Sequence, residues 1–379
     1  MKNFSLIFII SYLIFPLNIY ADNKLDKYVA SVKSAGVSLK LEQVFTVPGI
    51  PWGMAFVSPS ELIITEREGI IRLINLKSST NIKLKNTPEV LADGQGGMLD
   101  VAIPPDYKTS KWIYFTYVKD GNKQGVTVLA RAKLNKDRLT QWQELLVSKS
   151  GTPTSYHFGS RITFDDQGHV YFGIGDRGER PIAQDLTNHA GTIMRLNLDG
   201  SIPEDNPFKN IPAALPEIWS YGHRNPQGLS FDLKHKRLWE IEHGPRGGDE
   251  LNRILPGKNY GWPVISYGKE YWGPVAVGEG THKTGMQQPV KIYIPSIAPG
   301  SLIVYSGNAF PEWKANLFAG ALKLKHINRI VLNENGKAIK EERLLESLDE
   351  RIRALTQSPE GWIYFSTDSG IIYRLRPKQ

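Results

Sequence analysis

The chain contains 379 residues, carries a formal net charge of +8 and has no cysteine. The missing cysteines exclude disulfides, a thiol nucleophile, a zinc–thiolate site, an iron–sulfur cluster and a lipoprotein anchor, so the hydrophobic core alone must stabilise the fold. Lysines and arginines are spread along the chain, which favours a basic pocket for a small anion over nucleic-acid binding. Ordinary surface solubility is the alternative explanation of the charge.

The N-terminus has the pattern of a secretory signal. Lys2 is followed by a nearly wholly apolar run, Phe4–Ile19, and then by Ala21 before the polar Asp22. This order is typical of a cleaved leader. A membrane anchor is the alternative, but a bilayer span takes about 20 apolar residues and this run is shorter. We therefore expect a signal peptide over residues 1–21 and an exported mature protein over 22–379, most simply periplasmic, with no insertion into a membrane.

A repeated unit follows: a turn, an apolar alternating strand, a second turn and a second strand. Turn formers such as Asp166-Gln167-Gly168 separate the strands. The six units begin at Gly53, Gly97, Gly159, Gly228, Gly300 and Arg353, and their second strands at Glu61, Trp112, His169, Arg237, Asn316 and Gly361. Further strands follow in several units, for example after Gly69 and after Gly191.

Six such units predict an all-β, six-bladed propeller with four-stranded antiparallel blades, forming a single domain over residues 22–379. A helical solenoid would need apolar residues at helical spacing, and a sandwich would not repeat one unit six times. The last strand, Ile371–Leu375, can pair with residues near the N-terminus and close the ring. For the lead-in from Asp22 to about Leu41, a short helix is one option.

Two polar segments stand just before inner strands, where side chains can reach the mouth of a propeller channel. His157, in Tyr156-His157-Phe158-Gly159, is a natural general base because the pKa of imidazole lies near working pH. A lone histidine is more often structural, which is the alternative here. Arg224 and Asn225 suit a planar ligand with carboxylates or carbonyls, against the alternative of an ordinary turn with a surface arginine.

A third segment, Glu242–Glu250, is acidic and glycine-rich, and Lys258–Pro263 follows it. Such a loop can hold a hard cation such as Ca²⁺ through carboxylates and backbone carbonyls, although it lacks the EF-hand spacing. A solvated turn is the alternative, and His243 has no companions for a zinc site.

Further polar groups come from other blades, namely Gln95, Lys323, Arg351 and Arg353. Together with Arg224, the cations would repel one another unless a multiply charged anion lay between them. Surface ion pairs with Asp349 and Glu350 are the alternative for the two arginines.

Taken together, these motifs resemble the soluble aldose sugar dehydrogenases that depend on pyrroloquinoline quinone (PQQ), relatives of soluble glucose dehydrogenase. The resemblance extends from about Phe45 to Leu375. It is carried by pieces in the family's order: Gly94-Gln-Gly-Gly-Met-Leu-Asp, His157-Phe-Gly-Ser-Arg, Ala183-Gln-Asp-Leu, Glu217–Gly228, Glu242–Glu250, Lys258–Pro263, Gly320-Ala-Leu-Lys and Arg351-Ile-Arg.

The resemblance implies that His157 is the general base and that Arg224, with Ca²⁺, stabilises charge on the cofactor while hydride leaves C1 of an aldose and a lactone forms. An external electron acceptor would reoxidise PQQ. The implied PQQ-binding residues are Gln95, Arg224, Asn225, Tyr271, Ala321, Leu322, Lys323, Arg351 and Arg353. The implied Ca²⁺ ligands are the carbonyls of Gly244 and Pro245 beside PQQ, and Glu250 and Tyr260 at a structural site.

Two departures from the family pattern stand out. An acidic residue that orients the base in the glucose enzymes is replaced here by Tyr156, so another group must hold His157 or the base is less tightly placed. The loops are shorter than in the dimeric glucose enzymes, so we expect a monomer without their tight glucose preference. Arg177 stands near the substrate side, with no role assigned. A Ca²⁺-dependent propeller lactonase or esterase and a non-catalytic binding protein are the alternative functions.

Overall fold

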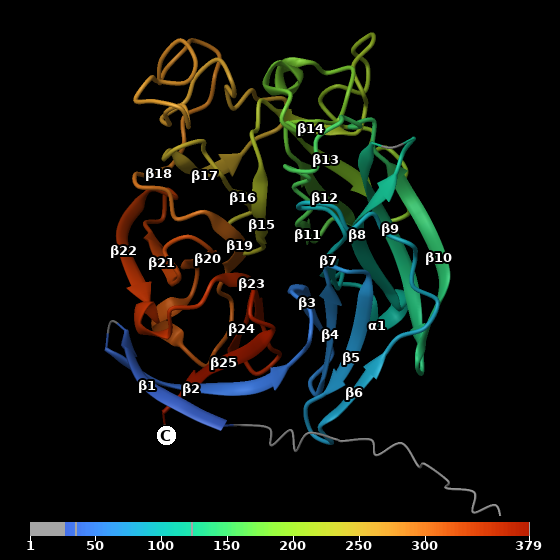
Figure 1. The fold of residues 1–379 in the computed structure, drawn as a ribbon, viewed down its shortest axis with the longest axis vertical. Helices are drawn as coiled ribbons and strands as arrows, with labels where there is room; N and C mark the ends of the chain where they lie inside the picture. Colours follow the sequence, from blue (N-terminus) through green and yellow to red (C-terminus); the bar gives the residue numbers. More distant parts are fainter. Residues whose placement is uncertain (1–26, 35, 123, 379) are drawn as a thin grey trace, which may run out of the picture.

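A computed structural model describes residues 27–34, 36–122 and 124–378 of the chain. Their strands form six antiparallel sheets around a central axis, so the predicted six-bladed propeller is confirmed. Figure 1 shows the six innermost strands, β3, β7, β11, β15, β19 and β23, encircling that axis. The expected signal peptide, residues 1–21, lies outside the described residues.

Each predicted two-strand unit forms the inner half of one blade. The first three blades contain β3 (Pro51–Ser58), β4 (Glu61–Glu66), β5 (Ile70–Asn75) and β6 (Thr80–Lys83); β7 (Met98–Ala102), β8 (Trp112–Asp120), β9 (Gly125–Asn135) and β10 (Arg138–Val147); and β11 (Ile162–Phe164), β12 (His169–Ile174), β13 (Thr192–Asn197) and β14 (Ile218–Tyr221). The next two contain β15 (Pro226–Asp232), β16 (Arg237–Glu242), β17 (Asp249–Ile254) and β18 (Lys291–Tyr293); and β19 (Pro299–Val304), β20 (Leu317–Ala321), β21 (Ile327–Leu332) and β22 (Ala338–Leu344).

The sixth sheet closes the ring and has five strands instead of four. Its order is β1 (Lys27–Ser34), β2 (Val37–Thr46), β25 (Ile371–Pro377), β24 (Ile363–Thr367) and β23 (Ile352–Gln357). β2 pairs antiparallel with β25, from Leu39 opposite Pro377 to Thr46 opposite Ile371, which confirms the expected closure.

The described part of the lead-in, from Lys27 onward, is strand, and the short-helix option was wrong there. Apolar Leu39 and Leu41 alternate with Lys40 and Glu42, a period of two that buries both leucines when the segment pairs with β25. Among the described residues the only α-helix is one turn, α1 (Tyr107–Ser110), beside three 3₁₀ turns, η1 (Arg180–Gln184), η2 (Pro311–Trp313) and η3 (Glu346–Leu348).

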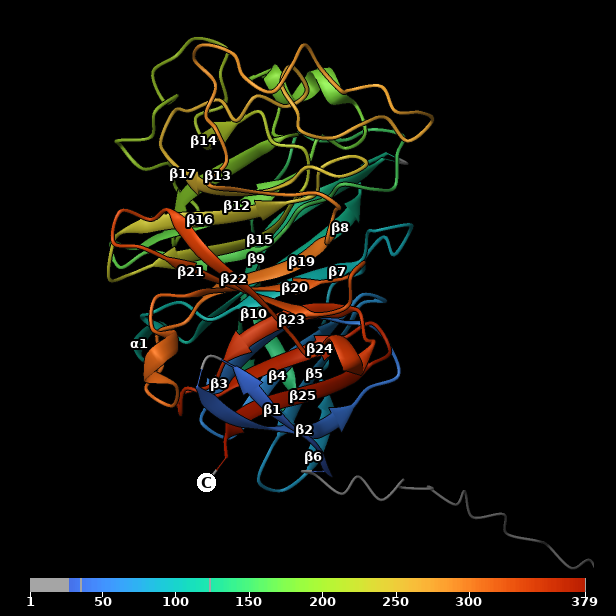
Figure 2. The ribbon, with the colours of Figure 1, turned by 90° about the vertical axis from the view of Figure 1, so that its left-hand side faces the viewer.

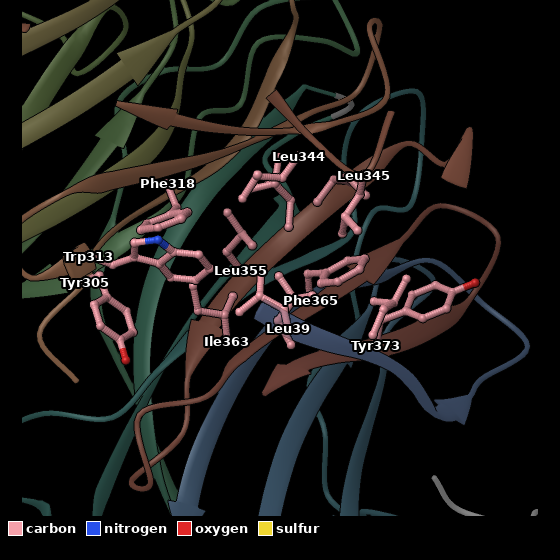
Figure 3. Packing of buried hydrophobic residues seen from close by; sticks show 14 of the residues in the cluster. Leu39, Tyr305, Trp313, Phe318, Leu344, Leu345, Leu355, Ile363, Phe365 and Tyr373 are labelled. Carbon is pink, nitrogen blue, oxygen red and sulfur yellow. The ribbon is translucent and has the colours of Figure 1, made fainter. Parts of the chain in front are cut away.

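Hydrophobic side chains fill the spaces between neighbouring sheets. In the cluster between the fifth and closing blades, Trp313 contacts Phe310 and Phe318 with ring centroids 4.4 and 5.0 Å apart. Figure 3 shows Leu39, from β2, pointing into the same cluster as Phe365 of the closing sheet. The N-terminal strands therefore complete the core as well as the hydrogen-bonded ring.

Antiparallel pairing decides which residues meet at the channel. Because the first and second strands of a blade run in opposite directions, the start of the first and the end of the second lie on the same face. The long connections β13–β14 and β17–β18, drawn in green and orange, lie at the same end of the molecule (Figures 1 and 2). No helix of the described ranges is long and apolar enough to cross a bilayer.

Candidate active site

A cavity of about 320 Å³ lies over the channel on this face, and strand starts and strand ends from several blades line it. Its lining residues are Ile50, Trp52, Arg67, Gln95, Phe158, Gly159, Asn225, Gln227, His243, Ala298, Leu322, Arg351, Arg353 and Asp368. Five of the expected cofactor-binding residues thus meet in one place: Gln95, Asn225, Leu322, Arg351 and Arg353. Burial lowers the pKa of His243 to about 3, so this imidazole is neutral.

The wall of the cavity has an excess of positive charge. Asp368 holds both Arg353, at 2.8 and 2.9 Å, and Arg351, at 2.7 Å. Burial alone would raise the Asp368 pKa, but hydrogen bonds and charge from these arginines outweigh it and keep the pKa below its usual range. Arg67 adds a third guanidinium, whose buried Nε has no hydrogen-bond partner among the described residues. The wall thus contains three arginines and one carboxylate, with Glu68 3.6 Å from Arg67 as a further acid, and this excess of positive charge favours an anionic ligand.

The alternative partners expected for the two arginines are engaged elsewhere. Asp349 pairs with Lys325 at 2.9 Å, and Glu350 accepts a hydrogen bond from Ser369 at 3.0 Å. The ion pairs at Arg351 and Arg353 therefore exist, but their acid is Asp368, at the end of the second strand of the same blade.

His157 directly precedes the third blade, on the channel face, and two hydrogen bonds hold it in place. Its backbone is left-handed, with φ of 59°, and its N–H donates to the side-chain oxygen of Gln95 at 2.9 Å. Its ring Nδ1 lies 2.6 Å from Oδ1 of Asp176, whose Oδ2 accepts the indole N–H of Trp262 at 2.7 Å. No described residue forms a hydrogen bond to Nε2 of His157. The ring is thus fixed at one nitrogen and available at the other.

The electrostatics of this pair suit a neutral base. Burial lowers the pKa of His157 below its usual value, and the positive charges of Arg224 and Arg177 add to this, while Asp176 opposes it. Burial would raise the pKa of Asp176, but the hydrogen bond and charge of His157 outweigh it, so Asp176 is ionised. An ionised Asp176 can only accept a hydrogen bond, so Nδ1 of His157 carries the proton and donates it. The lone pair of the neutral ring is then on Nε2.

Asp176 answers the question raised by Tyr156. The acid that orients the His157 ring comes not from the preceding position but from just after the second strand, β12. The tyrosine ring instead packs edge-on against His157, with centroids 4.8 Å apart. The option of a loosely placed base is therefore wrong.

Arg177 has a structural role on this loop. It is fully buried, and its guanidinium lies 3.7 Å from the centroid of the Phe158 ring. It donates to the carbonyls of Tyr156, Gly125, Ser150 and Thr154. Arg177 thus fixes the segment that carries His157, and it is not exposed to a substrate.

Arg224 lies in a small pocket next to the cavity. Its Nη1 donates to the carbonyl of His243 at 3.0 Å, and Oε2 of Glu242 accepts the N–H groups of Arg224 and Asn225 at 2.6 and 3.1 Å. The pocket also contains Gly244, Pro245, Glu250 and Tyr260, so all four expected Ca²⁺ ligands meet there. At Gly244 a Cβ atom would lie 2.2 Å from the carbonyl oxygen of Gly248, so this turn requires glycine.

Charges around this pocket fit a cation. Glu240, Glu242 and Glu250 all approach the amide of Asn252, at 3.1 to 3.4 Å. Burial raises the pKa of Glu240 and Glu250 well above the usual range, and the charge of Glu242 adds to this. Buried atoms without a partner include Oε1 of Glu240 and Oδ1 of Asn252. Several carboxylates and an amide oxygen are the donors that Ca²⁺ prefers.

Tyr260 can contribute only through its backbone. Its hydroxyl donates to the carbonyl of Arg253 at 2.6 Å and accepts the N–H of Leu255 at 2.9 Å. Pro245 presents its carbonyl to the hydroxyl of Tyr271, at 3.1 Å. These contacts leave the Tyr260 carbonyl as the group that could bind a metal.

Three other expected cofactor residues, Tyr271, Ala321 and Lys323, do not line the cavity. Tyr271 is 66% exposed on the β17–β18 connection, and Lys323 is exposed at the end of the fifth blade's second strand. The N–H groups of Ala321 and Leu322 already bond to His326 and Ala298, and the carbonyl of Leu322 accepts Arg351 Nη1 at 3.1 Å.

Four residues of the site were not predicted from the sequence: Asp176, Trp262, Arg67 and Asp368. Three of the four follow a second strand directly or after a short turn: Arg67 follows β4, Asp176 follows β12 and Asp368 follows β24. The antiparallel geometry that places strand starts at the channel also places these strand ends there, so this signal was available in the sequence.

Comparison with known proteins agrees with the fold and shows the family. A family model described as "Glucose / Sorbosone dehydrogenase" matches residues 49–374. The aldose sugar dehydrogenase YliI of Escherichia coli (strain K12) is 38% identical over 337 residues, which covers 86% of this chain and 90% of that protein. The quinoprotein glucose dehydrogenase B of Acinetobacter calcoaceticus is 29% identical and covers 84% of this chain and 83% of its own.

Solved structures give the same result. The apo form of the soluble E. coli aldose sugar dehydrogenase superposes with a TM-score of 0.86 at 34% identity, covering 90% of this chain and 100% of that one. A PQQ-bound aldose sugar dehydrogenase of Streptomyces coelicolor superposes with a TM-score of 0.72 at 26% identity, covering 90% and 98%. The chain therefore belongs to the glucose/sorbosone dehydrogenase family.

Proposed function

We propose that this protein is a PQQ-dependent aldose dehydrogenase that oxidises the anomeric hydroxyl of sugars to a lactone, with Ca²⁺ bound at the Arg224 pocket. One observation carries the proposal. The imidazole of His157 is fixed at Nδ1 and free at Nε2, and it lies on the same face of the propeller as a cavity. The wall of that cavity contains three arginines and one acid. The first supplies a base for an alcohol, and the second supplies a binding site for a polyanion such as a tricarboxylate quinone.

Each residue has a defined task in this reaction. Nε2 of His157 accepts the proton of the anomeric hydroxyl as hydride leaves the same carbon, so that a carbon–oxygen double bond forms in the lactone. Asp176 holds Nδ1 protonated and stabilises the positive ring that results. Trp262 keeps Asp176 oriented through its indole N–H. Bound PQQ would supply the two-electron acceptor for this hydride.

The cavity residues would hold the cofactor. Arg351, Arg353 and Arg67 offer guanidinium donors for carboxylates, and Gln95 and Asn225 offer amides. Arg224 is a fixed cation beside the candidate Ca²⁺ ligands Gly244 and Pro245, where it can stabilise negative charge developing on the ligand. Glu250 and the Tyr260 carbonyl would bind a structural Ca²⁺.

The cellular setting is part of the same proposal. We infer that an exported monomer oxidises small aldoses in the periplasm and passes electrons to an external acceptor. The leader expected over residues 1–21 supports export.

The direct test uses the chain from Asp22 onward, incubated with PQQ and excess Ca²⁺. Dye reduction is followed with a panel of aldoses for the unmodified chain, for His157→Ala and for His169→Ala. His169 is a matched control, because its Nδ1 also faces a carboxylate, Asp165 at 2.7 Å, but it starts β12 at the opposite end of the blade.

We expect saturable dye reduction that requires PQQ, Ca²⁺ and His157 but not His169. Binding of PQQ without turnover of any sugar would show that the substrate class is wrong. Failure to bind PQQ would overturn the cofactor, and a lactonase, an esterase or a binding protein would then have to be tested.

A further inference from the structure

One buried guanidinium occupies the propeller axis. Arg161, from the His157-Phe-Gly-Ser-Arg segment, is 6% exposed and directly precedes β11. Its Nε donates to the carbonyls of Gln227 and Gly300 at 3.2 and 3.1 Å, and its Nη2 donates to those of Gly300 and Arg353 at 2.6 and 2.8 Å. Its Nη1 donates to the carbonyl of Trp52 and to Oδ1 of Asp100, both at 2.9 Å.

These partners belong to five different blades, and Arg161 itself belongs to the sixth. Trp52 lies in β3, Asp100 in β7, Gln227 in β15, Gly300 in β19 and Arg353 in β23. All are on innermost strands, whose inner edges have no neighbouring strand within their own sheets. A single side chain thus satisfies backbone carbonyls that would otherwise face the channel unpaired.

Asp100 completes the arrangement. Its second oxygen accepts the N–H of Ile162 at 2.9 Å, so the acid holds both the side chain of Arg161 and the strand that carries it. Only a planar guanidinium has five N–H donors spread in one plane, and a lysine could reach at most three acceptors. The ring of Trp52 lies over the same guanidinium, 4.0 Å from its carbon to the ring centroid.

Arg161 also separates two hollows. Above it lies the 320 Å³ cavity, whose wall includes Trp52, Gln227 and Arg353, three of the residues that Arg161 contacts. Below it lies a hollow of about 470 Å³, lined by the far ends of the inner strands and by Arg161 and Asp100 themselves. The pair therefore forms the partition between the cofactor face and the opposite mouth of the channel.

We propose that Arg161, with Asp100, is a positioning residue: it joins all six blades at the axis and forms the floor that holds Trp52 and Arg353 in place beneath the ligand cavity. It does not touch the reacting atoms. The role of Arg161 in positioning residues for PQQ rests on the proposed function, whereas its role in joining the six blades does not.

The test compares Arg161→Lys and Arg161→Met with matched changes at Arg329. Arg329 is also buried, at 4% exposed, and bonds to Asn316 and Glu342 at 2.8 Å, but it lies on β21, away from the cavity. Arg161→Lys keeps the charge and part of the bonding, so it tests the proposal even if Arg161→Met fails to fold.

Hydrogen exchange of the cofactor-free chain tests the connection between blades. With Arg161→Lys we expect exchange at the starts of several of the inner strands β3, β7, β15, β19 and β23 to become at least about tenfold faster, because a lysine reaches at most three of their acceptors and the other strands lose their bond to the axis. With Arg329→Lys we expect the change to stay within the fifth blade. Faster exchange confined to β11 after Arg161→Lys would overturn the proposal.

Titration with PQQ in the presence of Ca²⁺ tests positioning. We expect Arg161→Lys to weaken PQQ binding about tenfold or more and Arg329→Lys to leave it within about twofold, even if both lower the thermal midpoint by a similar amount. Unchanged PQQ affinity in a folded Arg161→Lys protein would overturn the positioning role. If the unmodified chain binds no PQQ, the proposed function fails, and the exchange experiment still decides whether Arg161 joins the blades.

Discussion

Replacing Asp176 by Asn removes a buried negative charge next to His157 and exchanges one carboxylate oxygen for an NH₂ group. Oδ1 of Asp176 accepts both His157 Nδ1–H, at 2.6 Å, and the N–H of Gly178, at 2.9 Å. The amide oxygen should stay on that side, because two donors face it. The NH₂ group then faces the indole N–H of Trp262, which lies 2.7 Å away in the unmodified chain. The base keeps its tautomer, but the indole loses its acceptor.

The magnitude follows from the charge that the imidazole gains during the reaction. Two charges in contact, at an effective dielectric constant of about 20, attract by about 4 kcal/mol. The amide retains a neutral hydrogen bond worth about 1 kcal/mol. The expected loss is therefore about 3 kcal/mol of transition-state stabilisation, a fall in kcat of about 100-fold.

The assay is dye reduction at saturating PQQ, Ca²⁺ and aldose, with PQQ affinity measured separately. Asp232→Asn is the matched control, because Asp232 also lies 2.6 Å from a histidine Nδ1, that of His235, in a turn remote from the cavity. We expect the control to retain full kcat. A kcat for Asp176→Asn within about threefold of the unmodified chain, at equal PQQ affinity, would refute the role of Asp176.

Four further predictions follow from the site and the core. Burial and neighbouring arginines hold the pKa of His157 below about 6.5, and only the neutral ring accepts a proton. We therefore expect kcat/KM to be constant above this lowered pKa and to fall as the pH decreases through it. An inflection above about pH 7 would contradict this. Trp262→Phe, which removes the indole N–H, should reduce kcat about tenfold and move that inflection upward, because the carboxylate becomes more basic; an unchanged pH–rate profile would count against the contact. Removal of Ca²⁺ by a chelator should lower the thermal midpoint of the PQQ-free chain, and Glu250→Gln should largely abolish this response, as scanning calorimetry with and without Ca²⁺ would show. Phe318→Ala, which opens a cavity beside Trp313 (Figure 3), should reduce the free energy of unfolding by about 3–5 kcal/mol in urea titrations, and a loss below about 1 kcal/mol would show that the site collapses.

The propeller could be predicted because its evidence is local. Each blade repeats a turn and two alternating strands, and the side chains that make the strands amphipathic are neighbours in the sequence. The lead-in was harder, since one pairing partner of β2, the strand β25, lies at the other end of the chain. Only that pairing decides that Leu39 and Leu41 belong to a strand.

The candidate site divides in the same way. His157, Arg224, Gly244 and Arg353 stand in short motifs with distinctive residue types, so they could be selected from the sequence. Asp176 and Asp368 are single acids at strand ends with no motif of their own. Their roles depend on distances to His157 and to two arginines, which the winding of the blades sets.

The number of blades, the family and the basic and acidic loops could all be recognised from the amino-acid sequence alone, because short contiguous segments of the chain identify each of them. Only the tertiary structure decided which acid orients His157, which acid is shared by the two arginines, and that one arginine reaches all six blades. The physical reason is that hydrogen bonds and ion pairs act over a few ångströms, and ring closure brings together groups far apart in the chain.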